Sequence, residues 1–283
     1  MAPEYTVTTI CAVLEVSVSS YYYWLRSGRK QEEKTLRLYQ KIIEVYAEVK
    51  GIYGAPRICV ILREDKGIDV SVPTVSRAMH RLGLRSIVSE AFPQKKTWLN
   101  EEEKLLIVNL IRGLKIRRLN QVWTTDITYI RTVHDGNLYL ITFLDLFSRR
   151  IVAWGLRRRQ TAADVLDVLK IAVKSRRPGP GLIIHSDKGS QMRSALFREY
   201  LSRHGMAASY TSLDHSCDEN PAQESFHASL KKECIYQRRL LDYADAYEVI
   251  RGYIDGFYNS KRIHSALSYR SPLTFEASYS NFE

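Results

Sequence analysis

The segment between residues 121 and 212 constrains the fold most, because its pattern passes from strand-like runs to alternating helices and strands. Three runs rich in β-branched and aromatic residues come first, and short connections join them. Two short connections in succession predict an antiparallel meander. The three runs are Val122–Arg131, Leu138–Phe147 and Arg150–Leu156.

Helical and strand-like patterns then alternate along the chain. The predicted elements are a helix at 161–174, a strand at 182–185, a helix at 194–204, a strand at 207–212 and two long helices at 221–234 and 243–258. The predicted order is therefore β-β-β-α-β-α-β-α-α. A meander followed by βαβ crossovers gives one mixed sheet with helices on its faces. This is an α/β fold of the ribonuclease-H-like type.

Three carboxylates stand where such a fold would bring them together. Asp126 lies in the middle of the first strand, and Asp187 lies just past the end of the fourth. If these strands are parallel neighbours, both carboxylates face one cleft, because ligands gather near strand ends in open α/β sheets. The third carboxylate, Glu224, lies in the first turn of the next helix but one.

The start of that helix has several marks in the sequence. Asn220 suits the N-cap, Pro221 suits the first helical position, and Gln223 completes a capping-box pattern. The positive end of a helix favours an ionised carboxylate, as Glu224 would then be. Lys231 follows two turns later on nearly the same face. It either contacts a phosphate or belongs to a solvated surface.

The charge of the chain indicates its partner. The sequence has 42 Lys and Arg against 31 Asp and Glu, for a net charge of +11. A surplus of this sign favours a polyanion, and double-stranded DNA is the partner predicted. No signal-peptide or membrane-spanning pattern occurs, so no membrane partner is expected and the predicted location is cytoplasmic.

Three ionised carboxylates repel one another unless divalent cations bind between them. Mg²⁺ prefers a few carboxylates together with water and phosphate oxygens, and two such ions promote in-line displacement at phosphorus. The sequence therefore predicts two Mg²⁺ ions, with Mn²⁺ as a substitute, held by Asp126, Asp187 and Glu224. Catalysis is assigned to the same three residues. Water would attack in cleavage, and a DNA 3′-hydroxyl would attack in joining.

The residues before the sheet are predicted to be helical and to bind DNA. Two helix-turn-helix patterns occur, and the second ends in a helix at 75–82, with Ser71 as its cap and Gly83 as its stop. Polar side chains on this helix suit phosphates and base edges, although a solvated face has the same composition. With a later basic pair, the DNA-binding candidates are Thr74, Ser76, Arg77, Arg81, Arg117 and Arg118.

Four segments make up the predicted domain organisation. A short helical segment (1–30) is separated by a polar, basic break at Gly28–Glu33 from a helix-turn-helix DNA-binding domain (31–88). A basic linker and helix follow (89–118), the helix being expected at 101–114. The ribonuclease-H-like catalytic domain with its C-terminal tail completes the chain (119–283).

Several stretches, taken as an ordered set, resemble the DDE transposases of bacterial insertion sequences. The resemblance is to the second-reading-frame (OrfB) type, whose catalytic core is like that of retroviral integrases, and it covers nearly the whole chain. The matching stretches are Tyr53–Ile58, Thr74–Leu84, Val122–Tyr129, Asp145–Val152, His185–Gln191, Glu224–Glu233, Arg262–Leu267 and Tyr269–Pro272.

The resemblance implies binding to terminal inverted repeats, metal-dependent release of a 3′-hydroxyl and attack of that hydroxyl on a second DNA site. Because two DNA ends must be held together, a homodimer or larger assembly on DNA is expected. An upstream reading frame often supplies a further segment in this family, so an upstream-frame partner protein or fusion is also expected. The implied location is the bacterial nucleoid.

The chain departs from the family pattern just before Glu224. One residue more than usual separates Asp187 from Glu224, and Glu219-Asn220-Pro221 stands where Asp-Asn-Ala is usual. Asp218 or Glu219 stays open as an alternative third acid. Two other functions also stay open. One is a catalytically inactive DNA-binding remnant or regulator of the same family, and the other is a ribonuclease H or resolvase-type nuclease.

Overall fold

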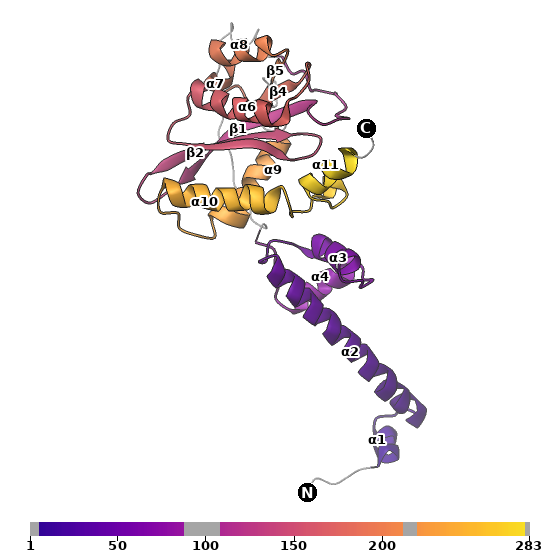
Figure 1. Cartoon of the computed structure of the whole chain (residues 1–283). Coiled ribbons are helices and arrows are strands. Elements are labelled where there is room, and N and C mark those ends of the chain that lie inside the picture. The colour runs from indigo at the N-terminus through magenta and orange to yellow at the C-terminus, as the bar shows by residue number, and fades with distance from the viewer. Residues whose placement is uncertain (1–5, 88–107, 212–219, 281–283) are drawn as a thin grey trace. The chain divides into compact units, whose positions relative to one another are not determined.

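The computed structural model describes residues 6–87, 108–211 and 220–280. The chain divides into two compact units, Met1–Ser89 and Glu90–Glu283. In Figure 1 the described part of the first unit contains helices, and that of the second contains a sheet flanked by helices. No helix in the described ranges is both long enough and apolar enough to cross a membrane.

Four helices form the described part of the N-terminal unit: α1 (Val7–Val13), α2 (Val18–Glu48), α3 (Ala55–Glu64) and α4 (Val72–Arg81). Fully buried side chains from the last three helices make its core, among them Ile42, Ile58, Leu62 and Val75. The cap predicted for α4 is confirmed, because the Ser71 hydroxyl accepts a hydrogen bond from the Thr74 backbone N–H.

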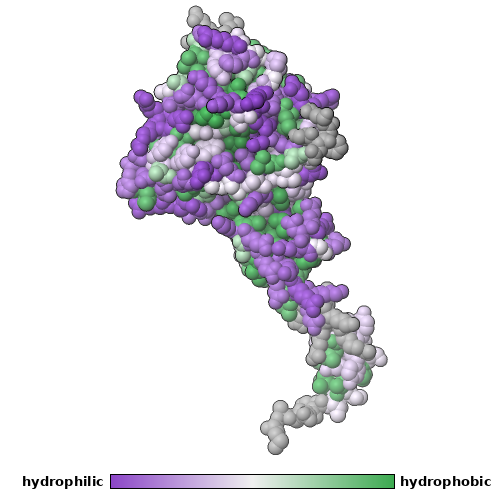
Figure 2. Space-filling model, viewed as in Figure 1, coloured by the Kyte–Doolittle hydropathy of each residue, from purple (hydrophilic) through white to green (hydrophobic). Residues whose placement is uncertain are grey.

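The break predicted at Gly28–Glu33 is wrong, because α2 continues through it as one helix. A glycine inside a helix costs about 1 kcal/mol relative to alanine. The residues after Gly28 are Arg, Lys, Gln and Glu, which favour helix and offset that cost. Exposed apolar side chains, among them Val13, Leu14 and Trp24, lie at the end of α1 and near the start of α2, and Figure 2 shows hydrophobic surface there.

A five-stranded mixed sheet forms the centre of the C-terminal unit, in the order β3-β2-β1-β4-β5. The strands are β1 (Val122–Arg131), β2 (Asn137–Asp145), β3 (Ile151–Arg157), β4 (Ile183–Ser186) and β5 (Ala207–Tyr210). The first three pair antiparallel, and β4 lies parallel between β1 and β5. The predicted meander and crossovers are therefore confirmed, and with them the ribonuclease-H-like order.

Helices cover both faces of this sheet. On one face α6 (Ala162–Arg176), α7 (Ser190–Arg193) and α8 (Ala195–Arg203) pack on a core that includes Trp123 and Phe143. On the other face α9 (Pro221–Leu230) and α10 (Tyr243–Tyr253) pack on a core that includes Leu140 and Phe226. Figure 1 shows the sheet between these two sets of helices. Helices therefore cover both faces of β1.

The two long C-terminal helices each end in a wider π turn. η1 (Lys231–Ile235) continues α9, and η2 (Ile254–Tyr258) continues α10. In each turn a backbone N–H donates five residues back, from Tyr236 to the Lys231 carbonyl at 2.8 Å and from Asn259 to the Ile254 carbonyl at 2.9 Å. Such turns occur most often as local insertions in α-helices.

A buried ion pair joins these two helical segments to the chain beyond them. Arg262 Nη2 donates to Glu233 Oε1 at 2.6 Å, and Tyr253 Oη donates to Glu233 Oε2 at 2.6 Å. Ser229 Oγ accepts a further bond from Arg262 at 3.0 Å. Burial alone would lower the pKa of Arg262, but the charge and hydrogen bonds of Glu233 outweigh it and raise that pKa.

The last described elements are η3 (Ser265–Leu267) and α11 (Pro272–Ser280). A second group of charges ties α11 to α6 and to the turn before β3. Glu276 accepts hydrogen bonds from Arg150 at 2.6 Å and from Arg176 at 2.7 and 2.8 Å. Burial by itself raises the pKa of Glu276, but these guanidiniums and the Ser148 hydroxyl hold it below its ordinary value.

The predicted linker and helix at 89–118 fall largely outside the described residues. Of the helix expected at 101–114, only the part from Val108 onward is described, and it forms a turn over Leu110–Gly113. The Asn109 side chain accepts from the backbone N–H groups of Ile111 and Arg112, both at 3.1 Å. An Asn that bonds to the backbone in this way favours a turn over a helix, so this part of the prediction is wrong.

Candidate active site

The pairing of β1 with β4 brings two of the three predicted acids to one edge of the sheet. The last parallel pair in the register is Thr125 with Ser186, so Asp126 and Asp187 each follow it by one residue. Part of the Asp187 residue is exposed to solvent. Its carboxyl group is nevertheless partly desolvated by the surrounding protein, and this burial raises its pKa. The negative charge of Asp126 is the second cause. The two carboxylates are therefore close enough to repel each other.

The loop after β4 holds the Asp187 side chain in place. The Gly189 backbone N–H donates to Asp187 Oδ1 at 3.0 Å. A Cβ atom at position 189 would lie 3.0 Å from this same oxygen, which is closer than most side chains tolerate. Glycine therefore lets the backbone approach the carboxylate directly.

Asp126 is oriented by two contacts. The Ile127 backbone N–H donates to Asp126 Oδ1 at 2.7 Å. His227 Nδ1 lies 3.2 Å from Asp126 Oδ2, and the other ring nitrogen of His227 lies 3.2 Å from the Thr142 hydroxyl on β2. About a quarter of the Asp126 side chain, 27%, stays exposed, so the carboxylate is held but still open to a ligand.

Gln223 fixes α9 against the strands that carry Asp126. Its side-chain amide donates to the Thr124 carbonyl at 2.7 Å and to the Thr142 carbonyl at 3.3 Å, and its oxygen accepts from the Thr142 hydroxyl at 3.0 Å. The predicted capping box is therefore wrong, because the buried strand carbonyls take the amide instead. Asn220 is the N-cap residue but makes no side-chain cap bond, and its amide points to the Thr125 carbonyl at 3.4 Å.

Glu224 lies in the first turn of α9, as predicted, and is half-buried. Within residues 6–87, 108–211 and 220–280, no three Asp, Glu, His or Cys side chains are close enough together to hold one metal ion. The structure thus brings Asp126 and Asp187 to the same edge of the sheet. The helix that carries Glu224, α9, packs on β1, but the three acids do not form one close cluster. The alternative third acids, Asp218 and Glu219, lie outside the described residues.

Comparison with known proteins identifies the family of the chain. Residues 117–216 and 204–272 match families described as integrase core domain, and residues 33–92 match the HTH-like domain family. The transposase of insertion sequence element IS904 from Lactococcus lactis is 37% identical, over 89% of this chain and 97% of its own length. The chain belongs to the DDE transposases of bacterial insertion sequences.

Other transposases of this kind match over a similar length. Transposase InsF of insertion sequence IS3A from Escherichia coli K12 is 32% identical, over 96% of this chain and 94% of its own length. Among solved structures, the HTLV-2 integrase catalytic core domain covers 55% of this chain at 15% identity with a TM-score of 0.42. That likeness is too low to support an argument about chemistry.

Lys231 of this transposase lies near the acids. Its ammonium group is 4.6 Å from the centre of the Tyr129 ring, and Tyr129 is 61% exposed. Burial lowers the pKa of Lys231, while the negative charge of Asp126 opposes this shift. Lys231 is therefore half-buried between an aromatic ring and the site, which is not the freely solvated position that one interpretation of the sequence suggested.

The remaining DNA-binding candidates lie on other parts of the transposase. Arg117 and Arg118 are exposed just before β1, where their backbone N–H groups donate to the Gln121 side chain at 2.7 and 3.3 Å. Thr74, Ser76, Arg77 and Arg81 lie on α4 of the N-terminal unit. The arginine pair belongs to the C-terminal unit and the four α4 residues to the N-terminal unit, so each group stays a candidate on its own unit.

Sequence reasoning missed His227. It follows Glu224 by three residues and so shares its helix face. The spacing of three residues from the predicted ligand Glu224 is the sequence signal that could have identified His227 as a candidate. Only the packing of α9 on β1 shows that its ring reaches Asp126.

Proposed function

We propose that this transposase binds the terminal inverted repeats of its element, cuts each 3′ end and transfers it to a second DNA site. The observation that carries the proposal is the parallel pairing of β1 and β4, which supports Asp126 and Asp187 as neighbouring ligands. Glu224 on the packed α9 is proposed as the third. In the cell such a protein would act on DNA at the nucleoid.

The three acids fit divalent cations by their chemistry. All are carboxylates, burial and then the negative charge of Asp126 raise the pKa of Asp187, and a cation would relieve the repulsion between the two. We assign two Mg²⁺ ions to Asp126, Asp187 and Glu224, with Mn²⁺ able to replace them. When bound, such ions would activate the attacking hydroxyl and stabilise the leaving oxygen. The protein's own part is to hold the three carboxylates and to position the phosphate.

Both steps are displacements at phosphorus and need no energy source. In cleavage, a water oxygen forms a bond to phosphorus, and the bond from phosphorus to the 3′ oxygen breaks, which leaves a 3′-hydroxyl. In transfer, this hydroxyl attacks a phosphodiester of the target, and one bond again replaces another. Lys231, half-buried near Asp126, is proposed to contact a non-bridging phosphate oxygen. Arg117 and Arg118 are proposed to contact the backbone further along the DNA.

The proposed reaction also bears on how many copies of the protein act together. Two DNA ends must meet one target, so we propose a dimer or larger assembly on the DNA. An upstream-frame segment, as partner protein or fusion, is proposed to take part in holding the ends.

The direct test uses short duplexes that carry the element's own terminal repeats. We expect nicking at the repeat end with Mn²⁺ or Mg²⁺, and none with EDTA or with Glu224→Gln. Specific binding without nicking, even after fusion to the upstream segment, would favour an inactive DNA-binding remnant. Nicking without joining would favour a nuclease.

Mn²⁺ should also raise the melting temperature of a protein with an active site. A ligand at a hundred times its Kd stabilises the folded state by about 2.7 kcal/mol.

His227 should act as a positioning residue in this site. Residues that orient metal ligands typically contribute about 10- to 100-fold in metal affinity. We therefore expect His227→Phe, which keeps a ring but cannot bond to Asp126, to raise the Mn²⁺ concentration at the midpoint of the melting-temperature shift at least about tenfold. His227→Asn, which can still donate, should recover most of the affinity. Equal midpoints for wild type and His227→Phe would contradict this role.

A further inference from the structure

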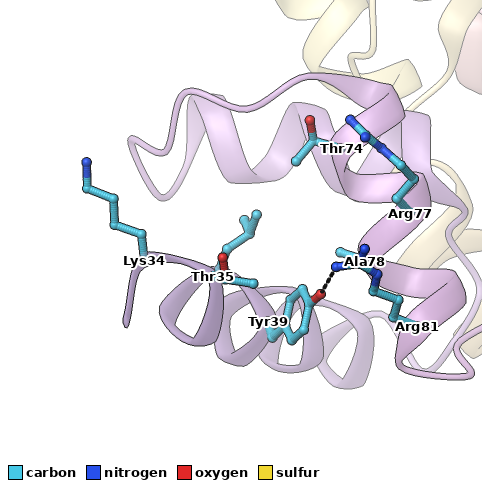
Figure 3. A pocket seen from close by; sticks show the side chains of 8 residues that line it. Lys34, Thr35, Tyr39, Thr74, Arg77, Ala78 and Arg81 are labelled. Carbon is cyan, nitrogen blue, oxygen red and sulfur yellow. Dashed lines mark hydrogen bonds between the residues drawn. The ribbon is translucent and has the colours of Figure 1, made fainter. Parts of the chain in front are cut away.

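A groove lies between α2 and α4 in the N-terminal unit, with a volume of about 320 Å³. Figure 3 shows side chains from both helices lining it. Three of them are the cations Lys34, Arg77 and Arg81, and three carry hydroxyl groups, Thr35, Tyr39 and Thr74. None of the described residues that line the groove is acidic. A concave, positively charged surface of this kind suits an anion.

The polar residues of α4 do not all face the same way. At 100° per residue, Thr74, Arg77 and Arg81 share the side of the helix that lines the groove. Ser76 and His80 lie on the opposite side and are exposed. The candidates that the sequence assigned together to one DNA-binding surface therefore belong to two.

Hydrogen bonds fix both guanidiniums on the groove side. Arg81 Nη1 donates to the Tyr39 hydroxyl at 3.2 Å, which ties it to α2 and is drawn as the dashed line in Figure 3. Arg77 Nε donates to the Pro73 carbonyl at 3.3 Å. A guanidinium has five N–H donors, so each arginine keeps donors for a ligand beyond the one bond described.

We propose that this groove binds a phosphate of the DNA backbone, with Arg77 and Arg81 as contacts and Tyr39 as the residue that positions Arg81. The proposal deepens the proposed function, on which it rests for the DNA. Arginine forks match phosphate oxygens, and backbone contacts fix the register of a protein on a duplex without reading sequence. The groove thus supplies affinity, and any reading of base edges falls to other side chains.

The test measures binding of the full-length chain to two duplexes, one with the terminal repeat and one with a scrambled sequence, across a series of salt concentrations. We expect Arg81→Gln and Arg77→Gln each to weaken binding to both duplexes by the same factor, about tenfold. Each should also lower the salt slope by about one. Tyr39→Phe should weaken binding by a smaller factor and leave the slope unchanged, because the charge of Arg81 remains.

Lys41→Gln is the matched control, because Lys41 lies on α2 outside the groove and pairs with Glu44 at 2.6 Å. It should change the slope less than either arginine variant. The proposal is overturned if the arginine variants, with unchanged helical content, bind as wild type or lose affinity for the terminal repeat alone. A wild type that binds both duplexes equally would count against the proposed repeat recognition, while the slopes would still test the groove.

Discussion

Asp126→Asn should abolish strand cleavage and joining, with a fall in rate of about a thousandfold or more. Removing one charged ligand from a site of this kind costs about 4 kcal/mol of transition-state stabilisation, and each 1.36 kcal/mol is tenfold in rate. Asn keeps the shape of the side chain and can still accept from the Ile127 backbone N–H. The measurement is nicking and strand transfer on labelled terminal-repeat duplexes with Mn²⁺.

Folding and binding must be shown to survive this change. The melting temperature without metal and the affinity for DNA should stay close to wild type, because the groove and α4 belong to the other unit. Asp167→Asn is the matched control, since Asp167 lies on α6 of the same unit with its side chain 60% exposed. If Asp126→Asn cut DNA as fast as Asp167→Asn, the assignment of Asp126 would be wrong.

Glu233→Gln should destabilise the C-terminal unit by about 3–5 kcal/mol, because it leaves the buried Arg262 charge without its partner. The two side chains are 0% and 5% exposed, so water cannot replace the lost carboxylate. The pKa of Tyr253 is raised, first by burial and next by the charge of Glu233, so the tyrosine keeps its proton and donates a hydrogen bond to the Glu233 carboxylate. Urea unfolding at neutral pH measures the loss.

An exposed pair in the same unit provides the control. Glu248 and Arg251 on α10 keep 60% and 57% of their side chains exposed, and Glu248→Gln should cost far less stability than Glu233→Gln, because water screens an exposed pair. The double variant Glu233→Met with Arg262→Met should recover part of the stability, because it removes both charges. Equal losses for Glu233→Gln and Glu248→Gln would show that the buried pair contributes no more than an exposed one.

The sheet could be predicted from the sequence because its strands carry a strong local signal. β-branched runs with short connections specify a meander, and the helix between β3 and β4 requires a crossover. These rules put β4 in the same sheet, whereas its pairing with β1, and so the position of Asp187 near Asp126, was only a condition in the sequence analysis and is found in the structure. Pro221 likewise marked the start of α9 correctly. These predictions depend on residues close together in sequence or on rules of chain topology.

The predictions that failed depend on contacts between distant residues. Gln223 has the spacing of a capping box, but the carbonyl of Thr124 offers its amide a buried partner. The ring of His227 reaches Asp126 only because α9 packs across β1. The π turn at Lys231, closed by the hydrogen bond from the Tyr236 N–H to the Lys231 carbonyl, was not predicted from the sequence. The continuous α2 shows the reverse case, where local helix propensity outweighed one glycine.

The order of the elements along the chain also determines when the transposase gains its activity during synthesis. Asp126 on β1 emerges from the ribosome first, but its neighbour Asp187 follows only after β4 is made, and α9 later still. The N-terminal unit has its own buried core and precedes all of them. On the proposed assignment, a chain that stops before Glu224 would be a DNA-binding fragment that cannot cut. Premature termination would then yield a competitor for the same DNA ends.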